Sequence, residues 1–335
     1  MRIHYADVPM AWNDQSMPDK SSDAVALGAE LVLSWALDVG LVADAREERR
    51  LASARLDVLA GGALPRGEAG DVALTARWAA FVCWVDDQID RRGLGSVPGQ
   101  LEAFTGQLRQ VFAAEPGRSA VGLTHVAVLR GLWEQTAAGM SAGWRSRFTA
   151  DYTDFLDACG QEAALRKSGV RLPLVDYVEL RRRTITLLPM LDVLERTGHA
   201  ALVEDPRVDT RLEDLRWAVA DVAGWANDLA SVADDEVAGQ DNLVVILARQ
   251  DGCSTAEARQ RAGAMIEDRR AGFRATAAAL RAESRLPQDR LEELRRYVNL
   301  VERFMSATLH WLAITGRFPA RAGAPAAHGP PVPRS

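Results

Sequence analysis

Two sets of oxygen-bearing side chains have the types and spacing to bind metal ions. The first ends the apolar run WAAFVCWVDDQIDRR at residues 78–92, with carboxylates at Asp86, Asp87 and Asp90. If residues 68–90 form one helix, these carboxylates share its last turn, where the helix dipole is negative. Hard divalent cations would relieve the resulting repulsion, and oxygen ligands of this kind suit Mg²⁺. The alternative is a solvated helix end before a turn.

The second set follows a largely apolar run that ends near Trp225. Asn227, Ser231 and Asp235 are four residues apart, so at about 100° per residue they drift only about 80° around a helix. An amide, a hydroxyl and a carboxylate on one helix face can coordinate Mg²⁺. Taken alone, such a stripe is also typical of a solvated surface.

Helices must position these side chains, because apolar residues recur at helical spacing along most of the chain and no alternating period-2 run, hairpin signal or internal repeat appears. The composition, with 48% hydrophobic and 26% charged residues, is that of a folded globular protein. We predict an all-α fold, a single large helical bundle over residues 21–318. Residues 1–20 should be irregular, and the Pro-, Ala- and Gly-rich tail at 319–335 should be disordered.

The first predicted helix begins at a cap near Ser22 or Asp23. The pattern predicts further helices at about 44–60, 68–90, 99–115, 121–138, 142–168, 174–196, 209–236, 240–250, 254–283 and 287–317. Gly61-Gly62 should end the second helix. Pro189 lies inside a helical pattern and predicts a kink or break there. The aromatic stripe of the 142–168 helix, formed by Trp144, Phe148, Tyr152 and Phe155, is predicted to be core.

Charge and cysteine content exclude several classes of protein. A net charge of −6 and the lack of a basic tract argue against nucleic-acid binding. The cysteines Cys83, Cys159 and Cys253 lack CxxC spacing, which favours reduced thiols and a cytoplasmic location, and five scattered histidines give no zinc signature. No run approaches the roughly 18 apolar residues of a membrane span. We therefore expect a soluble protein without a membrane partner.

On its motifs the chain resembles the bacterial class I terpene synthases (terpene cyclases). In that family a DDxxD motif and an NDxxSxxxE motif on facing helices of an α-bundle hold three Mg²⁺ ions, which bind the diphosphate of an isoprenoid substrate. Residues 86–90 match the first motif in full. Asn227, Asp228 and Ser231 match the second, with Asp235 where the family has Glu. The resemblance implies that these residues hold metal and that Asp228 contributes to substrate binding.

Two further matches extend the resemblance over nearly the whole chain. Arg181, in YVELRRRT, precedes Asn227 at the distance where the family places its diphosphate-sensing arginine, and Thr184 and Ile185 follow where relatives couple this sensing to ionisation. WLAITGRF resembles the family's closing motif, with Arg317 as the second diphosphate arginine. Besides Asp235 for Glu, the chain departs from the family pattern at two positions, with Asp234 for Lys or Arg and Phe318 for Tyr.

The resemblance implies ionisation of an allylic diphosphate, with Asp86, Arg181 and Arg317 in catalytic roles and diphosphate as the leaving group. The carbocation must be shielded from water in an apolar cavity with aromatic faces. Candidates that flank the motifs are Phe81, Trp84, Phe304 and Trp311; the alternative for each of them is a place in the core.

Several functions remain open at this point. The leading hypothesis is cyclisation of farnesyl diphosphate to a terpene hydrocarbon or alcohol by a monomer or homodimer, and geranyl or geranylgeranyl diphosphate is the alternative substrate. Asp234 and Phe318 motivate a weak synthase that hydrolyses prenyl diphosphates, and a non-catalytic helical binding protein is a further alternative. A chain-elongating prenyltransferase would carry a second DDxxD where this chain has NDLASVADD.

Overall fold

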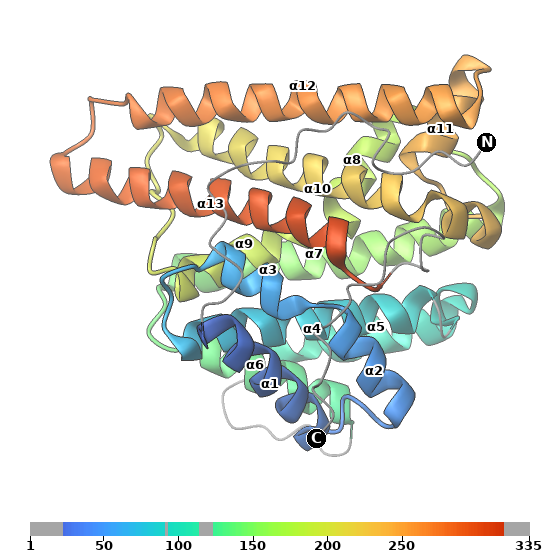
Figure 1. Ribbon diagram of the computed structural model, residues 1–335, viewed down its shortest axis with the longest axis horizontal. Coiled ribbons are helices and arrows are strands. Elements are labelled where there is room, and N and C mark those ends of the chain that lie inside the picture. Colours follow the sequence, from blue (N-terminus) through green and yellow to red (C-terminus); the bar gives the residue numbers. More distant parts are fainter. Residues whose placement is uncertain (1–22, 91–92, 114–122, 318–335) are drawn as a thin grey trace, which may run out of the picture.

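A computed structural model describes residues 23–90, 93–113 and 123–317, without the side chains of 23–30 and Pro98. Every regular element among these residues is a helix, which confirms the all-α fold (Figure 1). The helices are α1 (Asp23–Asp38), α2 (Ala45–Ser53), α3 (Leu56–Ala63), α4 (Ala69–Asp90), α5 (Pro98–Ala113), α6 (Thr124–Ala137), α7 (Ala142–Ser168), α8 (Leu174–Thr184), α9 (Leu187–Thr197), α10 (Asp209–Ala238), α11 (Leu243–Asp251), α12 (Thr255–Arg281) and α13 (Gln288–Ile314), with a 3₁₀ turn, η2, at Leu94–Ser96. The segments predicted for 1–20 and 319–335 lie outside the described residues.

The helix predicted for 44–60 is two helices, and this correction has a backbone cause. Arg55 has a φ of 52°, in the left-handed region, so the chain turns between α2 and α3. Gly61 and Gly62 are buried inside α3 and do not end a helix before them. α3 packs against α1, α4 and α13, and this tertiary packing overrides the local stop signal.

The break predicted at Pro189 exists but lies earlier in the chain. α8 ends at Thr184 and α9 begins at Leu187, and Thr186 between them has a φ of 63°. Pro189 lies in the first turn of α9, where a backbone N–H has no intrahelical acceptor, so the missing N–H costs no hydrogen bond. The left-handed residue, rather than the proline, interrupts the helix.

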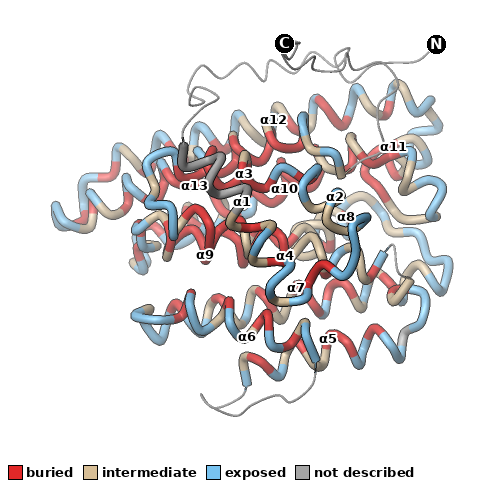
Figure 2. The backbone as a smooth tube through the Cα atoms, turned by 60° about the horizontal axis from the view of Figure 1, so that its bottom comes forward, coloured by how far each residue is buried: buried red, intermediate tan, exposed pale blue. Residues whose placement is uncertain are grey.

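The core runs through the middle of the bundle, where Figure 2 shows buried residues along α9 and α10. The predicted aromatic stripe of α7 is buried, with Trp144, Phe148, Tyr152 and Phe155 at most 3% exposed. α10 packs against α8, α9, α12 and α13, whereas α4 packs against α1, α3, α6 and α9. This packing leaves the carboxyl-terminal halves of α4 and α10 to line a shared cavity.

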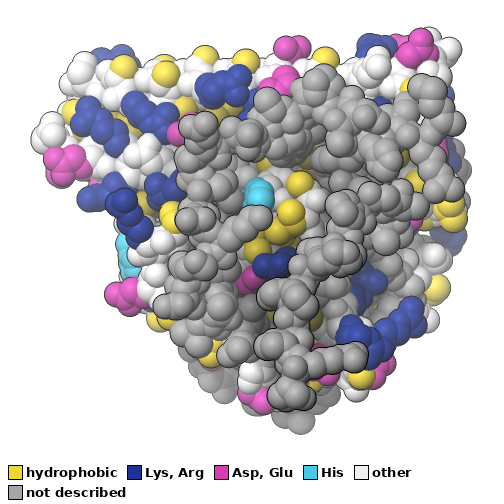
Figure 3. Space-filling view, viewed as in Figure 1, with side chains coloured by type: hydrophobic (Ala, Val, Ile, Leu, Met, Phe, Trp, Pro, Cys, Tyr) yellow, Lys and Arg dark blue, Asp and Glu magenta, His cyan; other side chains and the backbone are white. Residues whose placement is uncertain are grey.

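The described residues carry surface charges of both signs and three cysteines. Basic and acidic side chains both occur on the face shown in Figure 3. The three cysteines are free thiols. None of the helices in the described part of the chain is long and apolar enough to cross a lipid bilayer.

Candidate active site

One cavity of about 490 Å³ collects side chains from widely separated parts of the sequence. Its walls come mainly from α4, α7, α8, α9, α10 and α13. Eleven of the residues singled out in the sequence line it: Asp86, Asp90, Arg181, Ile185, Asn227, Asp228, Ser231, Asp235, Phe304, Trp311 and Arg317. The two polar motifs and both arginines therefore share one site.

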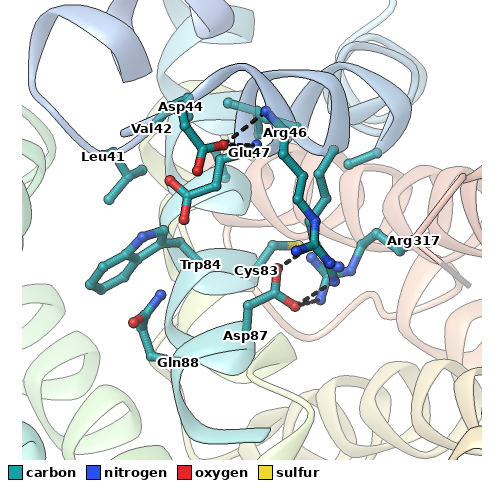
Figure 4. Close-up of a pocket in the computed structure, with 14 residues that line it drawn as sticks. Leu41, Val42, Asp44, Arg46, Glu47, Cys83, Trp84, Asp87, Gln88 and Arg317 are labelled. Atoms are coloured by element: carbon teal, nitrogen blue, oxygen red, sulfur yellow. Dashed lines mark hydrogen bonds and ion pairs between the residues drawn. The ribbon is translucent and has the colours of Figure 1, made fainter. Parts of the chain in front are cut away.

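The two adjacent aspartates of α4 face different cavities. Asp86 lines the cavity just described, whereas Asp87 lines a second one of about 530 Å³ (Figure 4). Asp87 accepts two hydrogen bonds of 2.8 Å from Nε and Nη2 of Arg50, and a third of 3.3 Å from Nη2 of Arg317. Consecutive helical residues point about 100° apart, which allows the two carboxylates to face different cavities. Asp87 thus pairs with two arginines in this structure, and its role as a metal ligand beside Asp86 and Asp90 stays a prediction.

Two of the four aromatic candidates lie outside the cavity. Phe81 is fully buried and stacks on Trp84 with a centroid distance of 6.0 Å, and Trp84 lines the second cavity (Figure 4). Phe304 and Trp311 of α13 do line the site. On α4, proximity in sequence to the motif therefore did not predict which aromatic side chains line the cavity. Trp84 is within one turn of Asp86 but lines the second cavity.

α10 presents its polar stripe along one face. Ser231 Oγ donates to Asp235 Oδ2 at 2.7 Å, and Asn227 Oδ1 accepts from Arg181 Nη2 at 2.9 Å. Asp228 is 2% exposed, and its carboxylate accepts hydrogen bonds from Arg181 Nε at 3.0 Å, from the Tyr177 hydroxyl and from the Leu243 backbone N–H. Asp228 therefore anchors Arg181, and its predicted contribution to substrate binding stays a prediction.

The cavity carries an excess of negative charge. Seven acidic side chains line it, but only three arginines do: the acids are Asp86, Asp90, Glu162, Asp228, Asp234, Asp235 and Asp241, and the arginines are Arg166, Arg181 and Arg317. Burial and the neighbouring Asp86 raise the pKa of Asp90 to about 6, and burial together with Asp90 raises the pKa of Glu162 to about 7. Uncompensated carboxylates of this kind favour a bound cation.

Both motif arginines remain charged in this environment. Burial alone would lower the pKa of Arg181, but Asp228 and other acidic neighbours raise it above the ordinary value. The same balance holds for Arg317, whose pKa is raised by Cys83, Asp86 and Asp87 against the effect of burial. Arg317 Nη2 donates to Asp86 Oδ2 at 2.8 Å. Each arginine thus donates a hydrogen bond to a side-chain oxygen of one of the two motifs.

The donors fit a hard divalent cation that is shared with a ligand. Carboxylates on α4 (Asp86 and Asp90) and an amide, a hydroxyl and a carboxylate on α10 supply oxygen atoms only, the ligands that Mg²⁺ prefers. Among the described residues, no three His, Cys, Asp or Glu side chains cluster closely enough to hold an ion by themselves. Ions here would need further oxygen atoms, such as those of a phosphate group.

Glu162, Arg166 and Gln240 are among the site residues that were missed in the sequence. Glu162 and Arg166 lie on the face of α7 that also presents Phe155 and Cys159 to the cavity, and charged residues continuing an apolar face were a readable signal. Gln240, between α10 and α11, donates to Asp90 Oδ1 at 2.8 Å, and no periodicity marks it. Phe318, expected at the closing motif, lies outside the described residues.

Comparison with known proteins gives matches along most of the chain. The family model "Terpene synthase family 2, C-terminal metal binding" matches residues 77–271. Pristinol synthase of Streptomyces pristinaespiralis is 30% identical over 295 residues, 85% of this chain and 78% of that protein. The 7-epi-alpha-eudesmol synthase of Streptomyces viridochromogenes is 27% identical over 306 residues, 86% of each protein.

Solved structures have the same fold. Wild-type cucumene synthase superposes with a TM-score of 0.75 at 25% identity, over 89% of this chain and 98% of its own. The structure of α-eudesmol synthase gives a TM-score of 0.78 over 94% and 100% of the two chains, and its 23% identity supports the fold alone. The family match contains both motifs and Arg181, and its metal-binding description implies a divalent metal. The chain therefore belongs to terpene synthase family 2 and is a class I terpene cyclase, a lyase that acts on phosphates.

Proposed function

We propose that the protein ionises farnesyl diphosphate and cyclises the resulting carbocation to a terpene hydrocarbon or alcohol. The observation that carries the proposal is the single cavity in which the oxygen donors of α4 and α10 meet Arg181 and Arg317. Two relatives support the substrate, since the 7-epi-alpha-eudesmol and (-)-beta-caryophyllene synthases are both described as (2E,6E)-farnesyl diphosphate cyclizing.

Asp86 and Asp90 on α4, and Asn227, Ser231 and Asp235 on α10, would hold three Mg²⁺ ions together with the diphosphate. When bound, the ions neutralise the charge that develops on the leaving diphosphate. These five side chains present their oxygen atoms from two helices that line the same cavity, so the protein orients the metal-binding oxygen atoms before the substrate arrives. No protein nucleophile is required.

Arg181 and Arg317 would exchange partners when diphosphate binds. Arg181 Nη2 now covers Asn227 Oδ1 at 2.9 Å, and Arg317 Nη2 covers Asp86 Oδ2 at 2.8 Å. A diphosphate, which carries several negative charges, attracts a guanidinium more strongly than the amide of Asn227 or the single carboxylate of Asp86 does. If each arginine turns to the diphosphate, the side-chain oxygen that it leaves becomes available as a metal ligand. Substrate binding and metal binding would then support each other.

The other part of the cavity would fold the hydrocarbon chain and exclude water. Ala79, Val82, Met190 and Phe304 present apolar surfaces, and Trp311 adds an aromatic face. Aromatic faces attract a carbocation by roughly 0.5–2 kcal/mol each. Exclusion of water prevents early quenching of the cation. Ile185 and Thr186, at the break between α8 and α9, also line the cavity.

The proposal is tested by incubating the purified protein with MgCl₂ and, separately, C10, C15 and C20 prenyl diphosphates, followed by gas chromatography–mass spectrometry of the extract. A cyclic hydrocarbon or alcohol from the C15 substrate is expected, and cyclic products from only C10 or C20 would reassign the substrate. Linear alcohols alone would favour diphosphate hydrolysis, for which the lining position of Asp234 near the expected diphosphate is the specific reason.

A further inference from the structure

Asn242 begins α11, immediately after the metal-binding part of α10, and its amide is fully engaged. The residue is 0% exposed. Its Oδ1 accepts from the Val244 backbone N–H at 2.9 Å, and its Nδ2 donates to the Asp228 carbonyl at 2.9 Å and to Asp235 Oδ2 at 2.7 Å. Capping a helix requires only Oδ1. The two bonds from Nδ2 therefore have another role.

These bonds determine how Asp235 faces the cavity. Its Oδ2 accepts from both Ser231 Oγ and Asn242 Nδ2, each at 2.7 Å. The hydrogen bonds that this carboxylate makes with described residues all end on Oδ2, which leaves Oδ1 as the oxygen available to a cation. The Ser231 hydroxyl is a donor in both of its hydrogen bonds, to Asp235 Oδ2 at 2.7 Å and to the Asn227 carbonyl at 3.0 Å, so its lone pairs are also left for a cation.

An aspartate at this position needs such an anchor. Its carboxylate is one methylene closer to the backbone of α10 than that of a glutamate, so it can reach a cation in the cavity from fewer orientations. A second hydrogen-bonded partner that fixes a ligating carboxylate is a general feature of metal sites. Asn242 supplies this partner from a different helix, which makes the orientation independent of side-chain motion within α10.

The segment around Asn242 also reaches the opposite motif. Gln240, two residues earlier, donates to Asp90 Oδ1 of α4 at 2.8 Å. Between them, Asp241 accepts from Arg171 Nη1 at 3.2 Å. The connection between α10 and α11 therefore contacts carboxylate oxygen atoms of both motifs. Asn242, at the α11 end of this connection, is buried.

We propose that Asn242 is a positioning residue of the metal site, which holds Asp235 as a one-oxygen ligand and directs the Ser231 lone pairs into the cavity. The inference rests on the proposed function, because it assigns a role at the same site. Asn242 acts through Asp235 and touches neither substrate nor ion.

The test is isothermal titration calorimetry of inorganic diphosphate into the intact protein in MgCl₂, for the wild type, Asn242→Ser and Asn242→Asp. Both variants keep an oxygen that can cap Val244, and both lose the donors to Asp235 and Asp228. Diphosphate affinity should fall by about 10- to 100-fold, the range for such supporting residues. Asn242→Asp should be the weaker binder, since it adds a negative charge beside Asp235. The Mg²⁺ concentration for half-maximal turnover should rise in the same order.

Ser254→Ala provides the matched control, because Ser254 caps α12 away from the cavity. It should lower the melting temperature and leave diphosphate affinity unchanged. Wild-type affinity in both Asn242 variants, with only a lower melting temperature, would show that Asn242 is a helix cap and would overturn the inference. Absence of magnesium-dependent diphosphate binding in the wild-type protein would instead overturn the proposed function.

Discussion

At the scale of single residues, Asp86 and Asp87 should differ sharply in function although they are neighbours. Asp86 lines the cavity, so Asp86→Ala should abolish magnesium-dependent turnover, with a loss of roughly 100-fold or more in kcat. Asp87→Asn should retain measurable activity and raise KM more than it lowers kcat, because Asp87 lines the second cavity and affects the site through its contact with Arg317. Steady-state kinetics with the active prenyl diphosphate measure both. Equal losses in the two variants would contradict the division between the faces.

Asp234 is the second residue-scale prediction. It lines the cavity and precedes Asp235 directly, at a position where related terpene synthases often carry Lys or Arg. Asp234→Lys should replace repulsion of the diphosphate by attraction and strengthen diphosphate binding on the order of 10-fold, about 1.4 kcal/mol. The effect should shrink as the salt concentration rises, because this side chain is partly exposed. A salt-independent change in affinity would point to an altered cavity shape instead.

At the scale of helices, two glycines should respond oppositely to alanine. Gly160 lies inside α7 with open space where an added Cβ would point, so Gly160→Ala should stabilise the protein by about 0.5–1 kcal/mol through helix propensity. At Gly198, which ends α9, a Cβ would lie 2.7 Å from Leu300 of α13, and Gly198→Ala should cost about 1–3 kcal/mol. Urea denaturation followed by circular dichroism measures both. A destabilised Gly160→Ala variant would refute the propensity argument.

The helices themselves could be predicted from sequence, because apolar spacing and Pro and Gly signals reflect local physics. The bounds expected for the α4 and α7 segments agree closely with Ala69–Asp90 and Ala142–Ser168. The breaks between helices were harder to predict from the sequence. Arg55 and Thr186 adopt left-handed φ values that neither residue type favours, and packing between helices stabilises this conformation.

The site was predictable to the extent that it follows helical phase. The spacing of Asn227, Ser231 and Asp235 placed them on one face, and they line one cavity. The partners of Asp87 could not be predicted from the sequence, because they depend on how helices rotate against one another. Asn242 was missed for the same reason, since its partner Asp235 is on another helix.

At the scale of the whole molecule, a buried charge cluster joins α7, α9 and α10 and should make stability depend on pH. Arg147 and Arg216 together pair with Asp192 and Glu195, and Arg216 also pairs with Asp151. Burial and the negative charge of Asp192 raise the pKa of Asp151 to about 7. Burial likewise raises the pKa of Glu195 to about 7, although both arginines oppose this shift.

The direction of this pH dependence follows from the number of protons bound by the folded and unfolded chains. An unfolded aspartate has a pKa of about 3.9, so between about pH 4 and 7 the folded protein holds a proton on Asp151 that the unfolded chain has released. This contribution to the free energy of unfolding is full below about pH 4 and is lost as the pH rises through 7. Melting temperatures measured from pH 5.5 to 8 should therefore fall, and Asp151→Asn should reduce the fall. An unchanged slope would show that Asp151 does not titrate in this range.

The end of α13 rests on the turn between α2 and α3, a contact that joins early and late parts of the chain. The Ala54 carbonyl accepts from Trp311 Nε1 and from Thr315 Oγ1 at 3.0 Å, and the Ser53 carbonyl accepts from the Gly316 N–H at 2.8 Å. Arg317 follows directly. During ribosomal synthesis the DDxxD segment emerges long before this arginine, and contacts between such distant residues close late in folding. A nascent chain would thus carry the first motif without its opposing guanidinium, and catalytic competence would be acquired only when the final helix docks.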